Sequence, residues 1–159
     1  MPVTRYPLPV TRYPLTVAGF ALFVRFKDAG SAMHAIYDQR VADFRKLRVW
    51  EAAQQLAIAS ERVAARMHGT RRATLRDQLL RAAMSVPTNI VEGSAHASPR
   101  QFARYLGYAI ASVTELEGHV QLARDLKLIT EQDFTSLLGR IVDVRKMLHG
   151  LLKKLRGNS

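Results

Sequence analysis

Apolar residues recur at steps of three and four from Val41 onward, and this spacing constrains the fold more than any other feature of the chain. Residues at such steps return to the same face of an α-helix, so the pattern predicts amphipathic helices. The expected helices cover residues 43–67, 72–92, 99–126 and 131–156. None of these segments shows the sustained alternation of apolar and polar residues that is typical of a half-buried strand.

The expected helices are roughly 30–40 Å long at 1.5 Å per residue, and only short loops join them. The start of the third is marked by Ser98, Pro99 and Gln101, which suit the N-cap, N1 and N3 positions. Short loops between long helices favour antiparallel neighbours. The sequence therefore predicts an all-α fold, an up-down-up-down antiparallel four-helix bundle, for residues 41–159.

Residues 1–40 do not continue the helical pattern. The heptapeptide PVTRYPL occupies residues 2–8 and again residues 9–15, and its two prolines per copy are incompatible with a regular helix. The apolar run that follows, residues 15–24, has the character of a secretory signal but is too short to span a membrane. We expect residues 1–40 to be an unstructured or non-native extension that the bundle does not need; a signal peptide is the alternative.

The charge balance of the chain favours a polyanionic partner. Lys and Arg number 24 against 13 Asp and Glu, which gives a net charge of +11. Such an excess attracts RNA, DNA or acidic lipid headgroups. Of that charge, +8 lies in residues 41–159, within the expected bundle.

Candidate phosphate-binding residues lie near the expected helix ends and along the last helix. They are Arg71, Arg72, Arg76, Arg100, Arg104, Arg145 and Lys146. Aromatic residues are sparse among these basic sites, so we expect contacts to the backbone of RNA or DNA rather than base stacking.

Catalytic and metal-binding patterns are missing from the sequence. The chain has no cysteine, which excludes disulfides, thiolate metal sites and cysteine nucleophiles. Its five histidines share no metal-ligand spacing, and Glu115 and Glu117 are two residues apart, so they point in different directions on a helix. We therefore expect no enzymatic activity, no metal and no cofactor.

The stretch RAAMSVPTNIVEG, residues 81–93, places poor helix formers in the middle of the second helix. Its polar residues recur at steps of four, four and three and would face the third helix across an antiparallel hairpin. The sequence predicts a structural polar network there, with a ligand site as the alternative. Its members are Arg81, Ser85, Asn89, Glu92, Ser112 and Glu115. Within it we expect an ion pair between Arg81 and Glu115.

The same stretch resembles the signature of the four-helix bundle family encoded within intervening sequences of 23S rRNA. Matching features include the preceding Leu75-Arg-Asp-Gln78, an early Val49-Trp50, a serine and phenylalanine four residues apart, and a Ser-x-x-Glu-Leu-Glu run at residues 112–117. The resemblance covers about residues 43–156.

The resemblance implies a cytoplasmic bacterial protein that assembles as a cyclic homopentamer and has no enzymatic activity. We also expect no membrane partner. Trp50 and the alanine-rich helix faces provide more apolar surface than one bundle needs to bury, which is consistent with assembly. The family is also similar in fold to the accessory proteins of diversity-generating retroelements, which bind a reverse transcriptase and nucleic acid. Two functions stay open: a nucleic-acid-binding scaffold, or an adaptor for a protein partner such as a reverse transcriptase, with charge serving only solubility.

Overall fold

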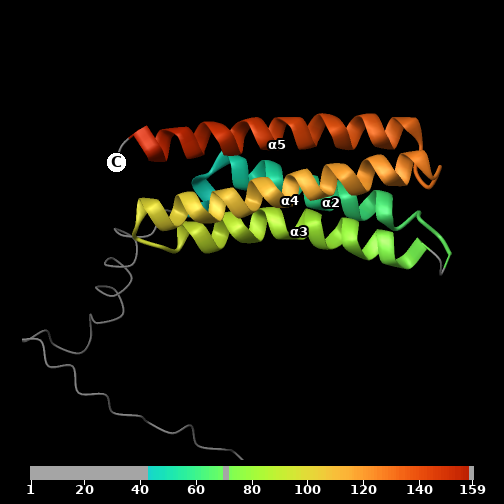
Figure 1. Ribbon diagram of the computed structural model, residues 1–159, viewed down its shortest axis with the longest axis horizontal. Helices are drawn as coiled ribbons and strands as arrows, with labels where there is room; N and C mark the ends of the chain where they lie inside the picture. Colours follow the sequence, from blue (N-terminus) through green and yellow to red (C-terminus); the bar gives the residue numbers. More distant parts are fainter. Residues whose placement is uncertain (1–42, 70–71, 158–159) are drawn as a thin grey trace, which may run out of the picture.

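The computed structural model describes residues 43–69 and 72–157, which form four long helices packed side by side (Figure 1). The elements are η1 (Phe44–Lys46), α2 (Arg48–Ala64), α3 (Ala73–Ser94), α4 (Pro99–Asp125) and α5 (Glu131–Gly157). Each long helix packs against the next one along the chain, and α2 also packs against α5. The predicted up-down-up-down antiparallel bundle is confirmed. The expected extension at residues 1–40 lies outside the described residues.

The core runs along the axis between the four helices and is built from the apolar stripes seen in the sequence. Its largest fully enclosed side chains include Leu56, Met67, Leu79, Ile90, Leu106, Leu116, Leu137, Ile141 and Leu148. Burial of each such side chain stabilises the fold by about 1.5–3 kcal/mol. Alanines 53, 83, 109 and 123 are also fully buried, so neighbouring helices can approach closely inside one subunit.

The first helix begins five residues later than predicted. Residues 44–46 form the separate 3₁₀ turn η1, capped by the side chain of Asp43, and Leu47 then adopts an extended backbone before α2 begins. This break lets Phe44 fold back onto Trp50, with ring centroids 4.8 Å apart in an edge-to-face arrangement. Trp50 is half-buried as a result, so packing within the subunit covers much of the side chain that suggested assembly.

A hydrogen-bonded cap starts α5 and ties it to the end of α2. The backbone N–H of Asp133 donates to Oγ1 of Thr130 at 3.0 Å, and that hydroxyl donates to the Asp133 carboxylate at 2.9 Å. The guanidinium of Arg66 pairs with the same carboxylate. Burial alone would raise the pKa of Asp133, but the hydrogen bonds from Arg66 and Thr130 outweigh it and hold the pKa below its ordinary value of 3.8.

The junction of α3 and α4 depends on Gly93. A Cβ atom at this position would lie 2.7 Å from Cδ2 of Phe102 and 2.7 Å from Cβ of Tyr105. Such distances are far shorter than ordinary carbon contacts, so only glycine permits α4 to pass this close to the last turn of α3. The close approach places Tyr105 directly against the end of α3.

Candidate nucleic-acid interface

The predicted phosphate-binding residues do not form one surface. Arg72 and Arg76 lie at the start of α3, whereas Arg100 and Arg104 lie at the start of α4, at the opposite end of the bundle (Figure 1). Because consecutive helices are antiparallel, their starts are separated by the length of α3, about 33 Å. Arg71 lies outside the described residues.

Two of the predicted cations are already paired with acids. The guanidinium of Arg145 forms hydrogen bonds with the carboxylate of Glu117 on α4, and both side chains are about two-thirds buried. Nε of Arg76 lies 3.3 Å from the carboxylate of its neighbour Asp77. A guanidinium held by a carboxylate is less available to a phosphate. Lys146, in contrast, is exposed and makes no ion pair within the described part of the chain.

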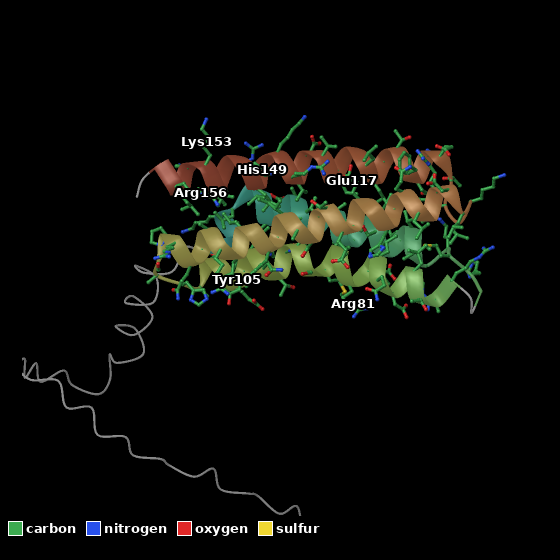
Figure 2. All side chains as sticks on the ribbon, in the orientation of Figure 1. Arg81, Tyr105, Glu117, His149, Lys153 and Arg156 are labelled. Carbon is green, nitrogen blue, oxygen red and sulfur yellow. The ribbon has the colours of Figure 1, made fainter. Side chains whose placement is uncertain are left out.

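Unopposed positive charge gathers where α4 begins and α5 ends. This surface, the basic end, consists of Arg100, Arg104, Lys153, Lys154 and Arg156. In Figure 2, Lys153 and Arg156 project from the last turns of α5. None of the five pairs with an acidic side chain among residues 43–69 and 72–157. The sequence has no Asp or Glu between Pro99 and Thr114 or after Asp143.

The opposite end of the bundle carries both signs of charge. Three of its cations form the ion pairs Arg66–Asp133, Arg76–Asp77 and Arg124–Asp125. The excess positive charge of the described chain is therefore concentrated toward the basic end rather than spread evenly. Uneven charge of this kind focuses the electrostatic potential on one surface.

A groove runs between α4 and α5 at the basic end. It has a volume of about 440 Å³, and its charged lining comes from Arg100, Arg104 and Arg156, with Pro99, Ala103 and Leu155 as neighbours. The three arginines come from segments more than fifty residues apart in sequence, which antiparallel packing brings together. Planar guanidinium groups bind phosphate oxygens in pairs, so this lining suits a phosphate backbone.

Aromatic side chains accompany the cations at this end, contrary to the expectation from sequence. His96, Gln101, Arg104, Tyr105 and Tyr108 line a cleft of about 240 Å³, the aromatic cleft. The rings of His96 and Tyr105 stack with centroids 5.1 Å apart, and Tyr108 meets Tyr105 edge to face at 5.8 Å. Nε of Arg104 donates a hydrogen bond to the hydroxyl of Tyr108 at 2.7 Å. Aromatic residues are sparse among the basic sites in general, but at Arg104 two tyrosines and a histidine lie close by.

A sequence signal for part of the aromatic cleft was present. Tyr105 and Tyr108 are three residues apart and share a helix face with Arg104 nearby. The position of His96 could not be predicted in the same way, because it depends on how tightly the chain turns between α3 and α4. That turn is set by the close contact at Gly93.

The predicted polar network forms only in part. Nδ2 of Asn89 donates to the carbonyl and to Oγ of Ser85, at 2.8 and 3.0 Å. Oγ of Ser85 lies 2.9 Å from Oγ of Ser112, which donates to the carbonyl of Tyr108 at 3.0 Å. The three polar side chains thus form a continuous hydrogen-bonded chain from α3 to α4, and it ends on the helical turn that carries Tyr108.

Arg81, Glu92 and Glu115 stay outside this hydrogen-bonded chain, and the predicted ion pair between Arg81 and Glu115 is absent. Figure 2 shows Arg81 pointing away from the bundle, and Glu115 instead lies 3.4 Å from Nε2 of His119. Each step of four residues turns a position about 40° around a helix. Over the two steps from Arg81 to Asn89 the polar line therefore moves from solvent to the contact with α4. All three charged side chains are exposed.

The described residues contain neither a metal-binding cluster nor a membrane-spanning helix. Across residues 43–69 and 72–157, no group of three or more His, Asp or Glu side chains is arranged to hold a metal ion. The same segments contain no helix with the length and apolar character needed to cross a membrane.

Comparisons with known proteins agree with the fold. A structural neighbour is a protein of unknown function from the S23 ribosomal protein family of Bacteroides thetaiotaomicron, with a TM-score of 0.62 and 21% identity. The match covers 66% of this chain and 98% of that one. No curated protein matches the sequence. The family model of the 23S rRNA-intervening sequence protein matches residues 45–150, about two-thirds of the chain. The chain therefore belongs to the 23S rRNA-intervening sequence protein family.

Proposed function

We propose that this protein is a non-enzymatic scaffold of the bacterial cytoplasm that binds RNA or DNA through its phosphates, with the basic end as the contact surface. One observation carries the proposal: five cations gather where α4 begins and α5 ends, and none of them has an acidic partner among the described residues. Solubility alone does not require positive side chains to lie apart from negative ones, since surfaces with both charges interspersed are soluble.

The proposal predicts strongly salt-dependent binding. Fluorescence anisotropy of labelled RNA and DNA with the full chain is the appropriate measurement. With six or more phosphate contacts, the affinity should fall by ~10³-fold or more between about 50 and 200 mM salt. An affinity weaker than about 1 mM for both nucleic acids at ~50 mM salt would instead favour the protein adaptor.

We also propose that five copies assemble as a ring. The support for this assembly is the family resemblance alone. Trp50 and the core alanines do not add to it, since they already pack within one subunit. A ring would repeat the basic end five times and multiply the phosphate contacts available to one nucleic acid. Light scattering at micromolar concentration tests this directly. A mass of 17.8 kDa, that of a single chain, would contradict assembly.

A further inference from the structure

We infer that the nucleic acid bound at the basic end is single-stranded and that one of its bases stacks in the aromatic cleft. The inference rests on the proposed function and adds a substrate class to it. Three features carry it: ring surface outside the core, an arginine shared between cleft and groove, and the absence of acidic residues from the lining of both.

The rings of the aromatic cleft are not required to complete the core. Tyr108 is 44% exposed, and His96 and Tyr105 are only partly buried. Tyr105 has a structural role, because its Cβ packs where Gly93 leaves room. Tyr108 has no comparable role, yet it presents a large ring to solvent at the mouth of the cleft. Exposed aromatic rings of this kind are the surfaces on which single-stranded nucleic acids stack their bases.

Arg104 connects the aromatic cleft to the phosphate-binding groove because it lines both. Its Nε is used by the Tyr108 hydroxyl, and its guanidinium carbon lies 5.6 Å from the centre of the Tyr108 ring. Its two terminal nitrogens make no hydrogen bond within the described residues and remain available to a phosphate. A strand that binds Arg104 through a phosphate therefore passes directly beside the Tyr108 ring.

The combination of groove and cleft favours a single strand over a duplex. In a duplex the faces of the bases are covered by their neighbours, and only base edges are accessible in the grooves. Stacking on Tyr108 needs an unstacked base, such as those in loops and single strands. Phosphate contacts alone do not distinguish the two forms. The aromatic cleft is therefore the part of this surface that can distinguish a single strand from a duplex.

The test compares a fluorescein-labelled single-stranded RNA with its duplex, using the full chain at low salt. Tyr108→Ala should weaken single-strand binding by roughly 5- to 150-fold, the loss that follows removal of one base–aromatic stack. Duplex binding should change by less than about 2-fold, because no charge is removed. Tyr108→Phe retains the ring and should retain the affinity for the single strand. Leu122→Ala changes another exposed apolar side chain of α4 and should alter neither form.

A 2-aminopurine base in the strand reports stacking directly, because its fluorescence is quenched when it stacks. The quenching should persist in Tyr108→Phe and disappear in Tyr108→Ala. If both nucleic acids bind with steep salt dependence but Tyr108→Ala leaves single-strand binding unchanged, the inference is overturned and the proposed function stands. Equal weakening of both forms also overturns it. If neither form binds at low salt, the proposed function itself fails.

Discussion

Replacement of Gly93 by alanine should destabilise the bundle, although alanine is the better helix former. Gly93 lies in the last turn of α3, and helix propensity alone would favour alanine there by about 1 kcal/mol. The added Cβ, however, would lie 2.7 Å from Cβ of Tyr105 and from Cδ2 of Phe102. Carbon atoms in good contact are about 3.5–4.0 Å apart, so both contacts are about 1 Å too short.

Rotamer changes cannot relieve this overlap. Cβ of Tyr105 is fixed by the backbone of α4, and the ring of Phe102 is only 7% exposed and enclosed by the core. The two helices must therefore move apart, and overpacking of this kind typically costs about 1–3 kcal/mol. Two simultaneous overlaps place the cost near 3 kcal/mol. After the gain in helix propensity, the free energy of unfolding should fall by about 2 kcal/mol.

Urea and thermal denaturation followed by circular dichroism measure this change. For a chain of this length, a loss of about 2 kcal/mol corresponds to a decrease in Tm of roughly 4–8 °C. Gly118→Ala and Gly139→Ala are matched controls, because a Cβ at either position has no neighbouring atom within 4 Å. Both should stabilise the protein by about 0.5–1 kcal/mol. An increase in stability for Gly93→Ala, similar to that of the controls, would refute the close approach of α3 and α4.

Three further changes test other parts of the fold by denaturation. Ser60→Ala should raise the free energy of unfolding by about 1 kcal/mol, because Oγ of Ser60 is fully buried without a hydrogen-bond partner in the described chain. Asn89→Ala should lower it by about 1 kcal/mol through loss of two hydrogen bonds to Ser85. Because the pKa of Asp133 is lowered in the folded state, its ionised carboxylate stabilises the fold at pH values above 3.8, the ordinary pKa of an aspartate. This stabilisation is lost as the pH falls through the folded-state pKa. Asp133→Asn should therefore reduce Tm at neutral pH, and Tm of the variant should fall less steeply than that of the unmodified protein below about pH 4. An equally steep fall of Tm in both proteins would argue against this contribution.

Helix positions were predictable to within two residues for α3, α4 and α5. Proline at the start of α4 and the Thr130 cap of α5 are local signals, so they can be read without the tertiary structure. The start of α2 was not predictable, because the extended backbone at Leu47 allows Phe44 to pack on Trp50. That contact is a tertiary effect, and the helical pattern of the sequence continues through it.

The candidate site was less predictable than the fold. Composition identified the cations but could not show which of them already pair with acids, as Arg145 does with Glu117. Similarly, the polar spacing correctly grouped Ser85 with Ser112 and Asn89 with Ser85. The spacing did not predict the position of Arg81, because residues four apart are displaced around the helix at each step. Arg81, at the outer end of this series, therefore faces solvent.

The most direct test of the proposed function compares equal charge reversals at the two ends of the bundle. Arg100→Glu with Arg156→Glu changes the basic end, and Arg62→Glu with Lys127→Glu is the control at the opposite end, where both cations are exposed. At about 150 mM salt, charges more than about 8 Å away are largely screened, so only local phosphate contacts should matter. The basic-end variant should lose at least about tenfold in RNA affinity, and the slope of log affinity against log salt should fall by about 1.4–1.8. The control should stay within about threefold of the unmodified protein, and equal weakening by both variants would contradict a nucleic-acid surface at the basic end.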